Sequence, residues 1–240
     1  MKEVNKRGIL GWLLSVILII FVMLITVSFS IGIPIYFRPL YYAQIGPLGI
    51  EEATGLTRGE IIAGYDEVLD YLTRPGGEFS AGAFAYSEEG KSHFEDCKVL
   101  FTLNATVYVI SALVISLIFL VKKLCGIKII SPLGLMPGFW SGALTLSVFG
   151  VIGVLAALDF DRAFYIFHTV FFPGKDNWMF NPNTDEIIMA MPEQFFAVCA
   201  LSIGLSVILI SLTLMAIGFY CFHLNRKKGE SIISPRKIIL

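Results

Sequence analysis

The run ILGWLLSVILIIFVMLITVSFSIGI, residues 9–33, contains no charged side chain. A helix crosses the ~30 Å hydrocarbon core of a bilayer with about 20 consecutive apolar residues, so this run is long enough to span it. Water is absent from that core, and every backbone N–H and C=O must therefore bond within the chain. The run predicts a transmembrane helix and places the chain among membrane proteins.

Three further segments meet the same criterion: residues 99–121, 133–158 and 195–223. The composition agrees, since 56% of the 240 residues are hydrophobic and 15% are charged, against roughly 25% charged in soluble domains. We predict an all-α integral membrane protein with four transmembrane helices, forming a single membrane domain over residues 1–240.

The Lys and Arg residues predict the orientation of the four spans. Eleven of the 18 fall on one side of a four-span topology. They are Lys2, Lys6, Arg7, Lys122, Lys123, Lys128, Arg226, Lys227, Lys228, Arg236 and Lys237. The loops on the other side, residues 34–98 and 159–194, carry 17 of the 19 acidic residues. Both termini are therefore expected to be cytoplasmic and both loops extracellular. The first span resembles a signal peptide, but its apolar core is too long, so we expect an uncleaved signal anchor.

The first extracellular loop contains an amphipathic pattern over residues 56–72. Thr57 and Glu60 have capping-box spacing, and apolar residues recur at helical intervals behind an acidic face. Such a helix could lie on the membrane surface or pack over the other loop. Interfacial helices usually carry a basic face, so packing over the other loop is favoured. The preceding aromatic residues 34–50 are expected to be irregular. Both loops are rich in aromatic residues and predict a lid at the outer membrane surface, with an ordinary aromatic belt as the alternative.

The chain has three histidines, His93, His168 and His223. His223 falls at the cytoplasmic end of the fourth predicted span and is expected to be interfacial. His93 and His168 fall in opposite extracellular loops at the same predicted depth, so they could face each other. If the chain is helical there, Asp96 lies one turn beyond His93. Imidazoles titrate near neutral pH and suit general acid–base catalysis, although spacing alone also allows two unrelated interfacial histidines.

Other chemistries have little support in the sequence. It contains no GxSxG, HExxH or CxxC motif, no phosphate-binding loop and no nucleic-acid-binding patch. Zinc held by the two histidines and Asp96 is a weaker interpretation, and no cofactor or metal is expected. Only Cys97 lies in an extracellular loop, so a disulfide framework is not available; a pair with Cys199 is the remaining option.

The segment FHTVFFPGKDNWMFNPNTDEIIMAMPEQFF, residues 167–196, contains F-H-x-x-F-F, W-x-F-x-P-x-T-D and P-E-x-F-F in that order. With the H-x-x-D of His93–Asp96, four spans and basic cytoplasmic edges, the chain resembles the lipoprotein intramolecular transacylase (Lit) family of Gram-positive bacteria. The resemblance implies an acyltransferase of the bacterial cell membrane. Its partners would be membrane lipid and diacylglyceryl-modified lipoproteins, and the oligomeric state stays open, a monomer included.

The implied reaction moves the sn-2 acyl chain of an S-diacylglyceryl cysteine to the α-amino group of the same cysteine, giving the lyso form. The family's two essential histidines correspond to His93 and His168. Attack closes an eight-membered ring, so positioning is a large part of catalysis. We expect one histidine to act as base and the other as acid, with His93 favoured as the base because Glu95 or Asp96 could support its imidazolium.

Oxyanion donors are expected among Lys175, Asn177, Trp178 and the amides near Gly174. The alternative to an enzyme is a non-enzymatic four-span binding or assembly protein whose extracellular lid binds a partner. A transporter is disfavoured because the spans contain essentially no charged residues.

Overall fold

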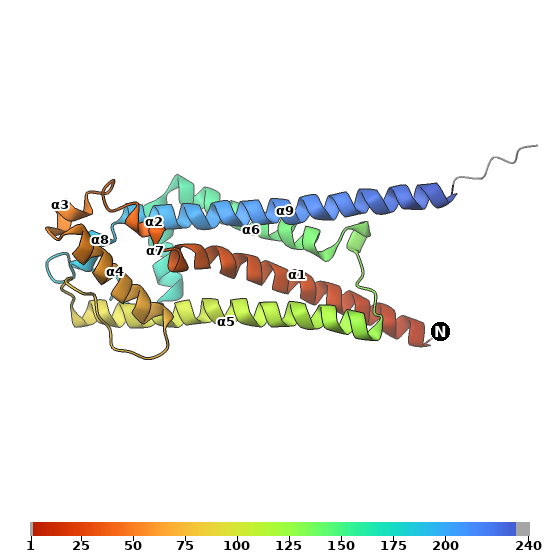
Figure 1. Ribbon diagram of the computed structural model, residues 1–240, viewed down its shortest axis with the longest axis horizontal. Coiled ribbons are helices and arrows are strands. Elements are labelled where there is room, and N and C mark those ends of the chain that lie inside the picture. Colours follow the sequence, from red (N-terminus) through yellow and green to blue (C-terminus); the bar gives the residue numbers. More distant parts are fainter. Residues whose placement is uncertain (1, 234–240) are drawn as a thin grey trace, which may run out of the picture. The chain divides into compact units, whose positions relative to one another are not determined.

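The computed structural model describes residues 2–233, and within them the chain forms helices and no strand. Four helices are long and apolar enough to cross a membrane, as predicted. They are α1 (Lys2–Tyr36), α5 (Glu88–Cys125), α6 (Pro137–Leu158) and α9 (Glu193–Ile233) (Figure 1). Of the predicted cytoplasmic residues, Arg236 and Lys237 lie outside the described residues, and only the backbone is described for Lys2 and Lys228.

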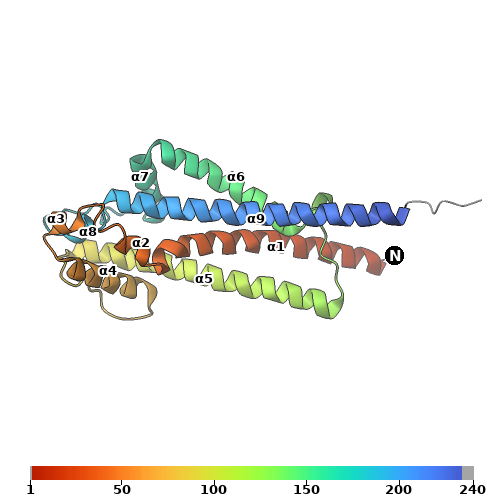
Figure 2. The same ribbon diagram turned by 45° about the horizontal axis from the view of Figure 1, so that its top comes forward.

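Shorter helices occupy the predicted loops (Figure 2). They are α2 (Pro39–Tyr42), α3 (Ile50–Thr54), α4 (Arg58–Thr73), η1 (Pro132–Gly134), α7 (Phe160–Phe171) and α8 (Ile187–Ala190). The expectation that residues 34–50 are irregular was wrong at α2, where a proline at the first helical position favours a helix start. The helix α7 was not predicted, and α5 begins well before the predicted span, so His93 lies on a helix.

The chain divides into two compact units. The first comprises Met1–Val27, Val109–Gly150 and Ser206–Leu240, and the second Ser28–Tyr108 and Val151–Leu205. In the first unit, a Cβ on Gly142 would lie 2.6 Å from the Ser211 carbonyl oxygen. Glycine is therefore required there for the close approach of α6 and α9, as in other membrane helix pairs. Gly150 has nothing within 4 Å of its Cβ position and serves no such contact.

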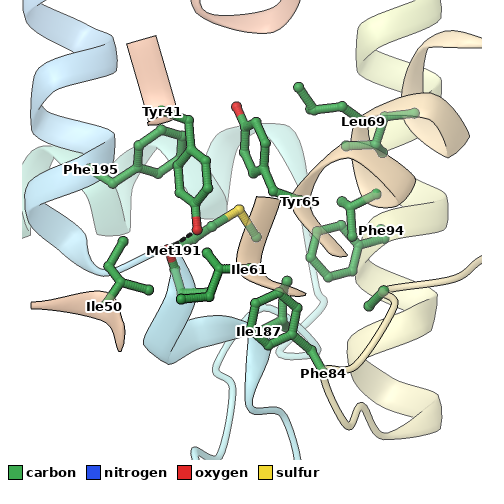
Figure 3. Packing of buried hydrophobic residues seen from close by; sticks show 14 of the residues in the cluster. Tyr41, Ile50, Ile61, Tyr65, Leu69, Phe84, Phe94, Ile187, Met191 and Phe195 are labelled. Carbon is green, nitrogen blue, oxygen red and sulfur yellow. Dashed lines mark hydrogen bonds between the residues drawn. The ribbon is translucent and has the colours of Figure 1, made fainter. Parts of the chain in front are cut away.

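The second unit has its own hydrophobic core, formed by α4 and segments of both loops (Figure 3). The capping box of Thr57 and Glu60 begins α4 as predicted. Its apolar face buries Ile61 and Tyr65 in one cluster with Ile187 and Phe195. The helix α4 therefore packs against residues of the second loop, the alternative that the sequence favoured.

Two residues near the end of α1, Tyr41 and Arg38, connect other segments to α4 and α8. The Tyr41 hydroxyl donates to the Ala190 carbonyl over 2.8 Å, and its ring stacks on that of Tyr65 at 3.7 Å between centroids. Arg38 pairs with Asp66 at 3.1 Å and also with Asp70. The acidic face of α4 thus binds the guanidinium of Arg38 from the same chain. This pairing explains why the polar face of the amphipathic helix is acidic rather than basic.

Asp185 connects the second loop to the beginning of α5. Its Oδ1 accepts from the Ser87 backbone N–H over 2.8 Å and from the Ser87 hydroxyl over 2.7 Å. Burial acts to raise the pKa of Asp185, but the hydrogen bonds from Ser87 outweigh it and hold the pKa below its usual range. The carboxylate therefore stays charged at neutral pH and fixes the helix that carries His93.

Candidate active site

His93 lies near the beginning of α5 and is 7% exposed. Aromatic rings surround it: the centroid of Phe172 lies 4.9 Å away and that of Phe180 5.5 Å away, both edge-on. Its Nδ1 is buried and has no hydrogen-bond partner among the described residues. An unpaired buried polar atom costs about 1–3 kcal/mol, so this nitrogen marks a position that a ligand could satisfy.

His168 lies on α7, whose beginning is capped by the Asp159 side chain accepting from the Arg162 N–H over 3.0 Å. His168 is the buried residue of this helix. Its Nδ1 lies 2.8 Å from the Phe164 carbonyl oxygen. A carbonyl only accepts, so Nδ1 carries the hydrogen and the neutral ring has a free lone pair on Nε2.

Burial also lowers the pKa of His168, and the hydrogen bond to Phe164 only partly opposes this effect. An imidazole with a lowered pKa is neutral at neutral pH, which is the form that accepts a proton. Geometry and charge therefore leave His168 able to accept a proton at Nε2.

The structure brings the two histidines together, although they are far apart in sequence. Their ring centroids lie 5.8 Å apart with an interplanar angle of 34°. The buried Phe172 ring contacts both, with its centroid 4.9 Å from that of His93 and 5.7 Å from that of His168. Trp178 also stacks on His168, with the ring centroids 4.5 Å apart and an interplanar angle of 27°. The pair thus lies in an aromatic enclosure that limits access of water.

The sequence suggested that Asp96 could support His93, but the two side chains share no hydrogen bond in the described structure. Its carboxylate pairs with Lys175 and accepts from the Asn177 side-chain amide over 3.0 Å. Glu95 is exposed and, within residues 2–233, makes no hydrogen bond to either histidine. The reason is helical geometry: Asp96 faces the loop after α7, and that loop supplies a cation and an amide to satisfy it.

The expected oxyanion donors are already engaged. Trp178 Nε1 donates to the Lys175 carbonyl over 3.1 Å, while Lys175 and Asn177 bind Asp96. These contacts connect α5 to the indole that stacks on His168. In this structure all three residues thus make contacts within the enclosure.

Cys97 was not among the predicted site residues, but it contacts one of them. Its Sγ lies 3.4 Å from His93 Nε2, and the spacing of four residues on a helix is the sequence signal for such a contact. All four cysteines are free, so Cys97 and Cys199 form no disulfide. Within residues 2–233, no group of three or more His, Cys, Asp and Glu side chains is arranged to hold a metal ion.

Comparison with known proteins identifies the family. The model of the family described as lipoprotein intramolecular transacylase Lit matches residues 16–196. The chain belongs to this family. The protein is therefore an acyltransferase and a multi-pass membrane protein, as the sequence predicted.

Solved structures of the Lit family share this fold. The membrane integral lipoprotein intramolecular transacylase Lit from Bacillus cereus matches with a TM-score of 0.79 and 24% identity over 92% of this chain and 99% of that chain. A variant of the Bacillus cereus protein with a histidine replaced by arginine matches with a TM-score of 0.77 and 21% identity, over 95% and 98% of the two chains. No curated protein matched.

Proposed function

We propose that this Lit family member moves the sn-2 acyl chain of a diacylglyceryl-modified lipoprotein to the α-amino group of the same cysteine. The product is a lipoprotein in the lyso form. The observation that carries the proposal is the pair of imidazoles, 5.8 Å apart, inside an aromatic enclosure. The substrate supplies both the attacking amine and the leaving oxygen, so the protein needs no nucleophile of its own.

His168 is the base in this scheme. The free lone pair on its Nε2 takes a proton from the amine, and Phe164 holds the ring in the tautomer that presents this lone pair. This assignment reverses the sequence-based preference for His93. That preference relied on a carboxylate beside His93, and Asp96 is bound to Lys175 and Asn177 instead.

His93 is the acid. During the reaction, the bond between the amine nitrogen and the acyl carbon forms, and the bond between that carbon and the sn-2 oxygen breaks. The proton lost by nitrogen is balanced by a proton delivered to the oxygen. The unpartnered Nδ1 of His93 is the atom assigned to deliver it, and the proton that His168 took from the amine replaces it on His93 in the same step, so that no imidazolate is left.

Positioning supplies much of the remaining rate. The attacking nitrogen and the ester carbonyl belong to one flexible molecule, and bringing them together closes an eight-membered ring. An enclosure that binds the closed conformation therefore uses binding energy to raise the rate of the reaction. Asp96, Lys175 and Asn177 support this by holding Trp178 against His168. Excluding water also prevents hydrolysis of the ester.

The proposed location is the bacterial cell membrane, with the site at the extracellular face and both termini cytoplasmic. The distribution of Lys and Arg supports this orientation. The partners are lipoprotein substrates and the surrounding lipid.

The test is expression in a bacterial host that lacks N-acylation of lipoproteins, followed by tandem mass spectrometry of one lipoprotein N-terminus. The transfer is an isomerisation, so the intact mass does not change. Loss of monoacylthioglycerol, leaving an N-acylated dehydroalanyl peptide, is the expected fragmentation. An N-terminus that still loses diacylthioglycerol and retains a free amine would overturn the proposal and favour a binding or assembly role.

A second arm tests whether the transfer is intramolecular. Two lipoproteins of different sequence, one with deuterated acyl chains, are mixed with the purified protein in lipid. Each product should keep its own isotope label. Exchange of labels between the two lipoproteins would contradict transfer within one molecule.

A further inference from the structure

The His93 ring has unequal surroundings at its two nitrogens. Nε2 lies 3.4 Å from the Cys97 sulfur, whereas Nδ1 is buried and has no partner in the described part of the chain. Asp96 and Glu95, the carboxylates nearest in sequence, make no hydrogen bond to the ring in the described part of the chain. The thiol is therefore the polar group of the protein that contacts this imidazole.

The chemistry of the two groups decides the direction of the hydrogen bond. A thiol with an ordinary pKa of about 8.5 carries its hydrogen at neutral pH. The unprotonated nitrogen of a neutral imidazole is a good acceptor, and sulfur is a weak one. A bond from S–H to Nε2 is therefore favoured over the reverse, and it places the ring hydrogen on Nδ1.

We propose that Cys97 is a positioning residue that holds His93 in the tautomer with hydrogen on Nδ1, so that the ring meets the substrate as a donor. The inference rests on the proposed function and deepens it by explaining how two neutral histidines take opposite roles. The Phe164 carbonyl directs His168 to accept at Nε2, and the Cys97 thiol directs His93 to donate at Nδ1. The cysteine keeps its own proton and forms no bond to the acyl chain.

A set of three variants separates this role from simple packing, since Cys97 also contacts the hydrophobic core. Cys97→Ser keeps a hydrogen-bond donor at the same position, and Cys97→Ala removes it. Cys199→Ala is the matched control, because Cys199 is also partly buried against that core but makes no hydrogen bond to either histidine among the described residues. Each variant is assayed in lipid for kcat and KM, and its thermal unfolding is recorded.

Loss of groups that orient a functional histidine typically reduces activity about 10- to 100-fold, and we expect this fall in kcat for Cys97→Ala with little change in KM. Cys97→Ser should stay within about threefold of the parent, since a hydroxyl donates to imidazole at least as well as a thiol. Cys199→Ala should match the parent. Parent-like activity in Cys97→Ala, or equal loss in Cys97→Ser and Cys97→Ala, would overturn the proposal.

Nitrogen-15 NMR of histidine-labelled wild-type protein in lipid nanodiscs tests the tautomer directly, even if Cys97→Ala does not fold. His93 should show hydrogen on Nδ1, and hydrogen on Nε2 would refute the assignment. This readout does not depend on turnover. A wild-type protein that forms no N-acyl product would refute the proposed function while leaving the tautomer measurable.

Discussion

The imidazoles of His93 and His168 lie 5.8 Å apart, although one belongs to α5 and the other to α7. Phe172 contacts both rings. The separation allows the two rings to serve the neighbouring atoms of one glyceryl ester, one taking a proton and the other returning it. Neither histidine has a hydrogen bond to a carboxylate among the described residues. The polar neighbour of His168 is the Phe164 carbonyl, and that of His93 is the Cys97 thiol.

Replacing either histidine with asparagine should nearly abolish N-acylation. General acid–base groups typically contribute about 100- to 10,000-fold, and we expect losses in this range for His93→Asn and His168→Asn. The matched control is His223→Asn, because His223 packs against Phe219 and Phe222 and not against this pair. Initial rates are measured by mass spectrometry of a lipoprotein N-terminus. Retained activity in either variant would remove that histidine from the mechanism.

Activity should fall in acid as His168 gains a proton. Burial holds its pKa below the ordinary 6.5, so the base remains neutral at pH 7 and becomes charged only at lower pH. NMR titration of labelled histidine, together with rates across the acid range, should place both midpoints below 6.5. A midpoint at or above 6.5 would contradict the effect of burial.

The stability of the folded protein should also fall as the pH is lowered. Between the lowered pKa and 6.5, the unfolded chain binds a proton at His168 that the folded protein does not bind. The contribution of this group to stability is therefore fully present above pH 6.5 and is lost as pH falls through the folded pKa. The melting temperature of the wild type minus that of His168→Asn should decrease as the pH is lowered over this range. A difference that stays constant with pH would mean that His168 has no shifted pKa.

Asp96→Asn should loosen the enclosure without removing a reacting group. The substitution removes a charge that binds Lys175 and Asn177, and charge-assisted hydrogen bonds contribute about 1.5–3 kcal/mol. We expect about a tenfold lower kcat, because Trp178 is less firmly held on His168. Glu95→Gln is the control, since Glu95 is its exposed neighbour in sequence. Equal rates for the two variants would show that the network does not position the site.

Replacement by alanine should affect protein stability differently at two glycines of α4. A Cβ on Gly64 would lie 2.6 Å from the Phe84 ring and 2.7 Å from the Ala81 carbonyl oxygen, and overpacking a core typically costs about 1–3 kcal/mol. Gly59 has nothing within 4 Å, so Gly59→Ala should be neutral or stabilise the helix by up to about 1 kcal/mol. Thermal unfolding in lipid measures both. Equal stability of the two variants would contradict the close packing of α4 on the segment 81–84.

The sequence by itself determined the four spans and the capped helix α4. An apolar run of span length has no stable alternative to a helix in lipid, and the capping box is a contact between residues three apart. It also named His93 and His168 as candidates, because they fall in the two predicted loops and match the histidines of the resembling family. All of these signals are local in the chain.

Only the tertiary structure decided which groups contact one another inside the candidate site. Asp96 was expected to support His93, but Lys175 and Asn177, far along the chain, bind it first. The tautomer of His168 depends on α7, a helix that the sequence did not predict. Which polar atom reaches which partner depends on chain segments that meet after folding, and residue spacing within one segment carries no information about such encounters.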